Sequence, residues 1–295
     1  MRIIRMGNII GKLILLILVF AFSNKSWSQQ AKFPLCPIGG DWEFVPDFSD
    51  EFNGKNLDSN KWWDFNPEWY GRKPAYFERK NVSLKGGSLQ LAARIQKPGK
   101  ATYENVVRGY DKFTTSAIKT QKRILYGYFE ARCKSMNAGV CNAFWLYDPL
   151  DHPAKYTEGS FSDEIDIFEF FGKRGQKKEY NCDRVFYATV HRFSTPYIES
   201  MVKKELSLPE KSFRSIMPFD FSSDYHIYGF LWTPAEMKWY IDGKEVFVRK
   251  NDFTAPLHII FDCEIMPDWV GLPEPEDLPA TFNIDYLRVW KSKSQ

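Results

Sequence analysis

The strongest constraint on this chain is a run of ten residues, DEIDIFEFFG at positions 163–172, in which carboxylates are interspersed among isoleucine and phenylalanine. Aromatic and β-branched residues favour a β-strand, whereas carboxylates are rarely buried unless they are paired or take part in chemistry. Side chains of a strand alternate between its two faces, so Glu164 and Asp166 share one face. Strict alternation would send Glu169 to the opposite face, and a one-residue β-bulge between Asp166 and Glu169 would return it. The sequence therefore predicts a bulged strand with three carboxylates on one surface.

The three carboxylates of this run are too close together to ionise all at once without a large free-energy cost, so one should keep its proton near neutral pH. A protonated acid beside an ionised carboxylate is the pair that retaining glycoside hydrolysis requires, at a separation of about 5–5.5 Å. The alternatives are a solvated edge strand and a calcium site built from carboxylates. A freely solvated strand is disfavoured, because Ile165 and Ile167 suit a core and phenylalanines flank the acids at positions 161, 168, 170 and 171.

The hexapeptide EIDIFE at positions 164–169 resembles the catalytic signature of glycoside hydrolase family 16 in its bulged form. That family includes laminarinases, lichenases, agarases, porphyranases and κ-carrageenases. The resemblance implies that Glu164 is the nucleophile, that Asp166 assists it electrostatically, and that Glu169 is the acid/base. It implies no cofactor for catalysis.

Several other segments alternate between apolar and polar residues and are separated by turn signals, such as Gly86-Gly87 and Asp242-Gly243. Many short strands with almost no helix predict an all-β sandwich or barrel. The segments DEFNG, GYFEARCK and NAFWLY also resemble family 16, and the resemblance covers residues 44–290. It implies a concanavalin A-like β-sandwich jelly roll with a concave substrate cleft.

Two local expectations accompany this fold. The strand at 126–134 carries Tyr128, Glu130, Arg132 and Lys134 on one face, and we expect that face to be solvated. Residues 194–223 are polar and contain three prolines, so we expect a long loop that walls the binding site.

Residues 1–28 have the pattern of a signal peptide. Basic residues at positions 2, 5 and 12 precede a short apolar run at 13–22, which is too short to span a bilayer comfortably. Ser26-Trp27-Ser28 is a small-x-small cleavage site, and we expect cleavage after Ser28. An uncleaved anchor is the alternative. The prediction is a secreted or periplasmic catalytic domain at 29–295 with no membrane span after cleavage.

Composition limits the partners of this domain. Removal of the segment, with its four basic residues, changes the formal net charge from +3 to −1 and leaves no basic tract, which argues against a nucleic-acid partner. Aromatic residues make up 17% of the chain, more than a core of this size requires. Because sugar rings have apolar faces that stack on aromatic side chains, this composition favours a polysaccharide partner.

Six residues are candidates for substrate contact. The resemblance implies that Trp145 packs under the sugar at the cleavage point, with a core tryptophan as the alternative. Family members often place a substrate-contacting histidine at the position of His191, with a structural histidine as the alternative. The remaining candidates are Trp63, Trp69, Arg72 and Glu264. The first two are either cleft platforms or loop anchors.

The resemblance also implies a structural Ca²⁺ away from the cleft, bound by Glu51, the carbonyl of Gly87 and Asp285. Oxygen ligands suit Ca²⁺, and the alternative is that the two acids are ordinary surface carboxylates. The five cysteines are an odd number, so their disulfide pairing stays open. Cys133 and Cys263 fall in strand-like runs that suit buried thiols. We expect a monomer.

The function implied is secreted endo-hydrolysis of a β-linked polysaccharide with retention of configuration. The segments GRKPAYF, YGYFEAR and FWLYDPLDHP look most like the agarase and porphyranase branch. We therefore rank an algal galactan first, with κ-carrageenan and then laminarin as alternatives. A non-catalytic lectin-like protein is the alternative from another class, because the same sandwich also serves lectins.

Overall fold

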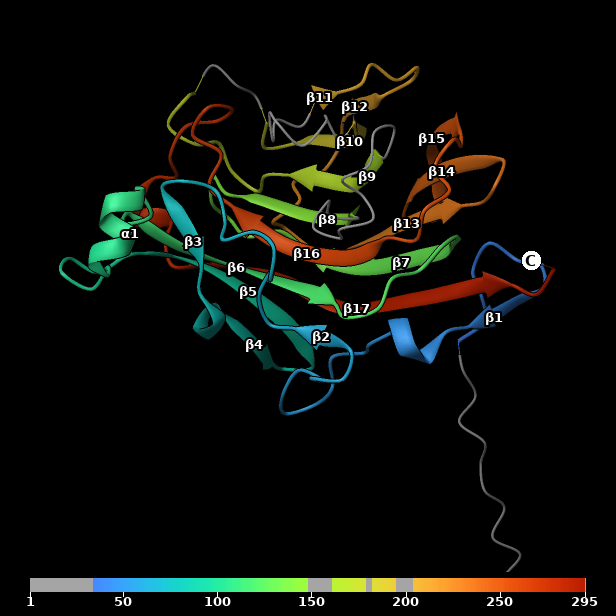
Figure 1. Cartoon of the computed structure of the whole chain (residues 1–295), viewed down its shortest axis with the longest axis horizontal. Helices are drawn as coiled ribbons and strands as arrows, with labels where there is room; N and C mark the ends of the chain where they lie inside the picture. Colours follow the sequence, from blue (N-terminus) through green and yellow to red (C-terminus); the bar gives the residue numbers. More distant parts are fainter. Residues whose placement is uncertain (1–33, 148–160, 179–181, 195–203, 295) are drawn as a thin grey trace, which may run out of the picture. The chain divides into compact units, whose positions relative to one another are not determined.

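The computed structural model describes residues 34–147, 161–178, 182–194 and 204–294 (Figure 1). The predicted signal peptide lies outside the described residues. Within the described part of the chain, no helix is long and apolar enough to cross a membrane. The residues from Pro34 onward belong to one unit, and its two packed sheets confirm the all-β sandwich expected from the sequence.

The front sheet of this sandwich has the strand order β12, β10, β9, β8, β16, β6 and β2, with the short β11 also paired to β10. Figure 1 shows β10, β9, β8 and β16 side by side. The bounds are β2 (Trp62–Trp63), β6 (Phe113–Thr120), β8 (Cys141–Tyr147), β9 (Phe161–Phe170), β10 (Val185–Ser194), β11 (Lys204–Glu205), β12 (Ser212–Ile216) and β16 (His258–Glu264).

The back sheet has the order β15, β14, β13, β7 and β17, and β17 pairs on its other side with both β5 and β1. Strand β4 adds to β5 by a hairpin through the predicted Gly86-Gly87 turn. The bounds are β1 (Trp42–Phe44), β4 (Val82–Lys85), β5 (Ser88–Ile95), β7 (Gly127–Lys134), β13 (His226–Trp232), β14 (Glu236–Ile241), β15 (Lys244–Lys250) and β17 (Ala280–Ser292).

The two sheets are joined along one edge, because the end of β5 pairs with the start of β6. Strand β3 (Ala75–Phe77) runs parallel to β6 at the same edge. The remaining elements are short: α1 (Tyr103–Arg108) and the 3₁₀ turns η1 (Pro46–Phe48), η2 (Arg79–Asn81) and η4 (Pro275–Asp277). The sequence did not predict α1, which Thr102 caps at its start and Gly109 closes in a left-handed conformation.

The core between the sheets is built largely from phenylalanine. Phe144 stacks on Phe261 at a centroid distance of 4.4 Å, and Phe168 stacks on Phe170 at 4.3 Å. All four rings are fully buried, and each contributes roughly 1.5–3 kcal/mol of hydrophobic stabilisation. Cys133 and Cys263 are buried free thiols, as their strand positions predicted.

The expectation of a long loop over residues 194–223 is wrong for its second half. Strand β12 forms there and pairs with β10 over five residues. Its outward and inward residues alternate, and Phe213 packs against Phe247 at 5.2 Å. The sequence SFRSI does not itself alternate, because Ile216 lies on the exposed face with Arg214, so the strand is set by its pairing with β10.

The expectation of a solvated outer face on β7 is also wrong at two positions. Tyr128 and Glu130 are 2% and 7% exposed. The N-terminal segment around Phe44 covers this face together with Trp290. Glu130 accepts hydrogen bonds from Tyr286 at 2.9 Å and Tyr128 at 3.3 Å, and burial is the main cause that raises the pKa of its carboxyl.

Candidate active site

Strand β9 contains the predicted bulge. On the β8 side, Asp166 is paired with Trp145 and Phe168 with Phe144, so Ile167 is an extra residue without a partner. The β10 side shows a shift at the same place. Ile165, Ile167 and Phe168 are all buried in the core. Two consecutive residues therefore face inward, and Glu169 returns to the face of Glu164 and Asp166.

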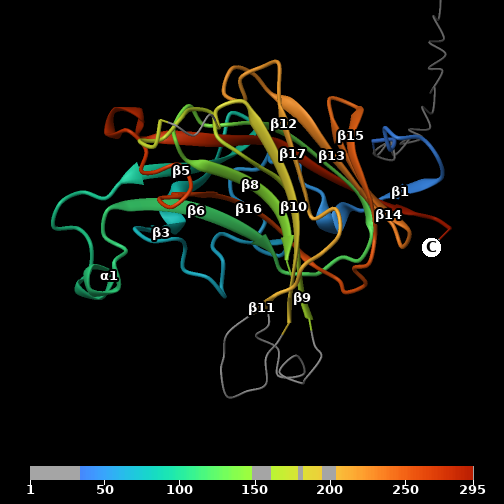
Figure 2. The ribbon, with the colours of Figure 1, turned by 90° about the horizontal axis from the view of Figure 1, so that it is seen from above.

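The register of the neighbouring strands decides what surrounds the carboxylates. Residues paired across a ladder share a face, and their side chains lie within contact distance. The β9–β8 pairs are Glu164 with Tyr147, Asp166 with Trp145, and Glu169 with Ala143. On the other side His191 of β10 is paired with Glu164. In Figure 2, β9 and β10 run together toward the edge where β11 lies.

A cavity of about 680 Å³ lies over this face, and all three predicted catalytic carboxylates line it. Five of the six candidate substrate residues also line it, namely Trp69, Arg72, Trp145, His191 and Glu264. These residues come from β8, β9, β10, β16 and the loop after β2. The cavity is therefore an acidic and aromatic concavity on the front sheet.

His191 lies among three carboxylates. Its Nε2 is 3.2 Å from Asp166 Oδ2 and 3.9 Å from Glu164 Oε1, and its Nδ1 is 2.6 Å from Glu205 Oε1. Burial alone would lower the pKa of His191, but the hydrogen bond and charge of Asp166, with help from Glu164 and Glu205, raise it to about 9. The imidazolium is therefore charged at neutral pH, and its positive charge lies among the three acids.

Glu169 has the opposite electrostatic environment. Burial raises the pKa of its carboxyl well above the usual range, and the negative charges of Asp166, Glu264 and Glu164 raise it further. The Cys141 thiol donates a long contact of 3.8 Å to its Oε1. Glu169 therefore holds a proton near neutral pH, as a general acid must.

The family model for the β-porphyranase A–D domain of glycoside hydrolase family 16 matches residues 42–292. The chain belongs to glycoside hydrolase family 16. This membership confirms the family that the sequence resemblance implied.

Relatives in family 16 cover most of the chain. β-Porphyranase E of Zobellia galactanivorans is 31% identical over 251 residues, covering 82% of this chain and 84% of that protein. β-Porphyranase D of the same organism is 27% identical over 282 residues, covering 88% of this chain and 62% of that protein. The chain thus spans about three-fifths of the length of porphyranase D. The crystal structure of a β-porphyranase from the gut bacterium Bacteroides plebeius superposes with a TM-score of 0.69 at 27% identity, covering 88% of this chain and 94% of that one.

In this family 16 chain, Arg72 and Glu264 form an ion pair on the far side of the cavity from His191. Arg72 Nε donates to Glu264 Oε2 at 2.7 Å, and the guanidinium lies 5.6 Å from the Trp69 ring. Burial raises the pKa of Glu264, and the charge of Arg72 opposes that rise. Arg72 is half-exposed, so it presents a cation to the cavity.

One candidate lies elsewhere. Trp63 does not line the cavity but packs on His258, with ring centroids 6.0 Å apart, and near Lys119.

Two further residues of the site, Glu205 and Asp262, were not predicted from the sequence. Glu205 belongs to the segment taken for a loop. Asp262 had a usable signal, because it lies two residues before Glu264 in the strand HIIFDCE and so shares its face.

The expected calcium ligands do not fit a cation site as they lie in the structure. Glu51 receives two hydrogen bonds from Arg288, at 2.8 and 2.9 Å. Asp285 pairs with Arg132 at 2.7 Å. Each carboxylate is therefore already neutralised by an arginine.

A second place to consider for a metal is the catalytic cluster itself. Ligand atoms of Glu164, Asp166 and His191 lie within 4.8 Å of one another. In the structure His191 contacts both acids directly, with Nε2 3.2 Å from Asp166 Oδ2 and 3.9 Å from Glu164 Oε1. The three groups therefore form one compact cluster in the cavity.

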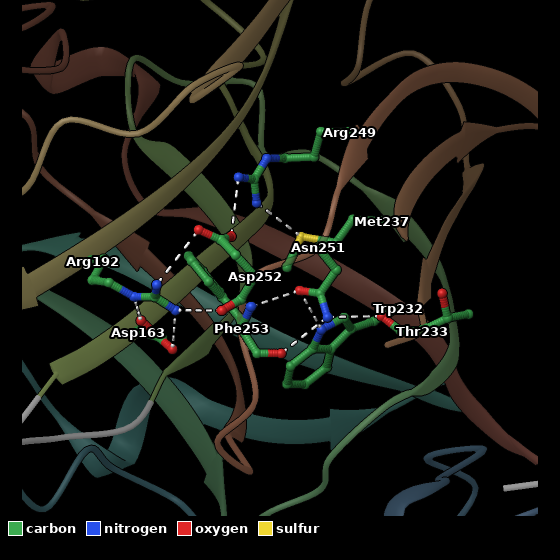
Figure 3. A network of polar contacts seen from close by, with 9 residues as sticks. All are labelled: Asp163, Arg192, Trp232, Thr233, Met237, Arg249, Asn251, Asp252 and Phe253. Atoms are coloured by element: carbon green, nitrogen blue, oxygen red, sulfur yellow. Dashed lines mark hydrogen bonds and ion pairs between the residues drawn. The ribbon is translucent and has the colours of Figure 1, made fainter. Parts of the chain in front are cut away.

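An ion-pair network fixes the rear of the site (Figure 3). Arg192 donates to Asp163 at 2.6 and 3.0 Å, and also to the backbone oxygen of Asp252 at 2.9 Å. Asp163 and Arg192 precede and follow the paired residues Glu164 and His191, so their side chains point to the opposite face of the sheet. The network therefore connects β9 and β10 to Asp252, in the segment after β15.

Proposed function

We propose that this chain is an endo-acting, retaining glycoside hydrolase that cleaves a β-linked algal galactan, porphyran or agarose. The observation that carries the proposal is the division of labour on β9. Glu169 is held protonated, while Glu164 and Asp166 lie beside the His191 cation, and all three acids face one cavity. Two carboxyls in these two states are what double displacement at a sugar carbon needs.

In the first step, the Glu164 carboxylate attacks the anomeric carbon and forms a glycosyl ester. The bond to the leaving sugar breaks, and Glu169 transfers its proton to the departing oxygen. In the second step, Glu169, now ionised, takes a proton from water, whose oxygen attacks the same carbon and releases Glu164. Two inversions give overall retention.

The neighbouring residues would assist each step. The His191 imidazolium contacts both Asp166 and Glu164, so its positive charge offsets the repulsion between these two acids and holds the nucleophile in place. Trp145 and Trp69, whose rings meet edge to face at 6.4 Å, form an aromatic wall for the apolar faces of the sugars. The relatives named β-porphyranases favour a galactan as the substrate. Export through the predicted leader and a monomeric state remain predictions.

The experiment is a substrate screen. Purified protein lacking residues 1–28 is incubated with porphyran, agarose, κ-carrageenan and laminarin, and the products are sized over time. Glu164→Gln is the matched control, because it keeps the shape of the side chain and removes the nucleophile.

We expect an early fall in chain length on porphyran or agarose, which indicates endo cleavage, and no products from the control. Cleavage of κ-carrageenan or laminarin alone would reassign the substrate. Binding without cleavage would support the lectin-like alternative.

A further inference from the structure

The indole of Trp145 has a hydrogen-bond partner beneath the cavity. Trp145 Nε1 donates to Asp262 Oδ2 at 3.1 Å. Asp262 is completely buried, and Trp145 is 8% exposed. The contact therefore joins the floor of the cavity to a carboxyl that substrate does not touch.

The strand register explains how Asp262 reaches the ring. Asp262 is paired with Ala143 of β8 on one side and Ala117 of β6 on the other, while Trp145 is paired with Ile260. The carboxyl and the indole are thus diagonal neighbours on one face. Alanine on both flanks leaves room for the carboxyl to turn toward the indole.

We propose that Asp262 is a positioning residue, which fixes the Trp145 indole as the platform for the sugar and so sets how tightly the cavity holds substrate. This inference rests on the proposed function. A tryptophan can rotate about two side-chain torsions, and a hydrogen bond to its only donor fixes one orientation.

The surroundings of Asp262 favour its neutral form. Burial raises the pKa of Asp262 well above the usual range, and the charges of Glu264 and Glu169 raise it further. The indole hydrogen bond and the charge of Arg72 oppose this rise, and Arg72 is already bound to Glu264. The other nearby titratable group, Cys141, holds its proton, because burial raises the pKa of that thiol.

Because burial favours the neutral form of Asp262, two substitutions should differ in their effect on the indole. Asp262→Asn keeps a carbonyl acceptor for the indole and carries no charge, so it should behave as the native residue does. Asp262→Leu has a similar volume and no acceptor, so it frees the indole. Because Trp145 acts on bound sugar, the loss should appear in KM rather than in kcat.

The kinetic test uses these two variants and both again in a Trp145→Phe background, which lacks the indole donor. We expect Asp262→Leu to raise KM about five- to tenfold with kcat nearly unchanged, and Asp262→Asn to match the wild type. In the Trp145→Phe background, Asp262→Leu should add almost nothing. The proposal is overturned if Asp262→Asn is as impaired as Asp262→Leu, or if Asp262→Leu is equally harmful without the indole.

A second readout needs no activity. The indole N–H resonance of Trp145, assigned by its loss in Trp145→Phe, should exchange with solvent slowly in the wild type and in Asp262→Asn. Exchange should be much faster in Asp262→Leu or, if that variant does not fold, in Asp262→Ala. Equal exchange in all proteins would refute the positioning role. If no polysaccharide is cleaved, the proposed function fails, and the exchange rates still decide the role of Asp262.

Discussion

His191 Nε2 lies 3.2 Å from Asp166 Oδ2, while its Nδ1 lies 2.6 Å from Glu205 Oε1. Both ring nitrogens therefore face carboxylates, and both must donate a proton. A neutral imidazole would turn a lone pair toward one of these oxygens. The contact geometry thus requires the positive charge, which links the carboxylate face of β9 to β11.

We expect this charge to appear in the pH dependence of stability. The pKa of His191 is raised from 6.5 to about 9, so the folded state binds this proton more tightly than the unfolded chain does. The contribution is fully present below about pH 6.5 and is lost as the pH rises through about 9. His191→Gln should lower the free energy of unfolding by roughly 2–3 kcal/mol at acidic pH and far less at alkaline pH.

Urea unfolding near pH 6 and near pH 10 measures this difference. Glu205→Gln is the matched control, because it weakens one partner of His191 and keeps the ring. A smaller loss with the same pH trend is expected for it. A loss for His191→Gln that does not depend on pH would show that the imidazole is not charged in the folded protein.

The bulge makes a second prediction. Ile167 is the residue that has no partner on β8, so deleting it leaves the regular sequence EIDFE with all three carboxylates still on one face. The deleted side chain is 1% exposed, and its loss should cost about 2–4 kcal/mol of stability. We expect a folded protein with reduced but measurable hydrolysis.

Deleting Ile165 instead places Glu164 directly before Asp166, on opposite faces of the strand, and should abolish hydrolysis. Unfolding and activity assays on the two deletions form the comparison. Equal activity in both would show that the shared face is not what matters.

The network behind the site supplies a third prediction. Arg192→Met leaves Asp163, whose side chain is 5% exposed, without its two guanidinium hydrogen bonds. Removing one partner of a buried pair typically costs about 3–5 kcal/mol, and kcat should fall as well, because Glu164 and His191 are the adjacent residues. Urea unfolding and kinetics test both effects.

The double variant Arg192→Met with Asp163→Leu is the control. An apolar replacement of both partners is often close to neutral, so it should recover much of the lost stability. If the double variant is no more stable than Arg192→Met, the effect does not come from an unpaired carboxylate.

The fourth prediction concerns calcium. Because arginines already pair with Glu51 and Asp285, we expect a chelator to leave the melting temperature unchanged. Elemental analysis should find no stoichiometric calcium. A clear fall in melting temperature that added Ca²⁺ reverses would restore the site that the family resemblance implied.

The sequence predicted the strands and the three acidic residues of the site from the alternation of side chains. Glu164 and Asp166 follow strict alternation and Glu169 breaks it, and that break located the bulge. Trp145, His191 and Glu264 also line the predicted cavity. Their roles in substrate contact stay predictions.

The other features of the site and fold depended on how distant strands pair, which the local sequence does not encode. Glu205 lies 14 residues after His191, in a segment whose polar composition suggested a loop. The outer face of β7 looked solvated because its cover, the segment around Phe44, pairs with β17 at the other end of the chain. Trp63 was placed with the cleft because it adjoins other loop aromatics, but its strand β2 directs it toward His258.

The central claim is that Glu164 is the nucleophile and Glu169 the acid/base. The most direct measurement is azide rescue of Glu169→Ala and Glu164→Ala, using an activated aryl glycoside that the enzyme accepts, with the anomeric configuration of the products read by NMR. Azide needs no general base, so it can attack the glycosyl-enzyme that Glu164 still forms. The account predicts a glycosyl azide of retained configuration from Glu169→Ala, and at most an inverted one from Glu164→Ala. A retained azide from Glu164→Ala, with no rescue of Glu169→Ala, would contradict it.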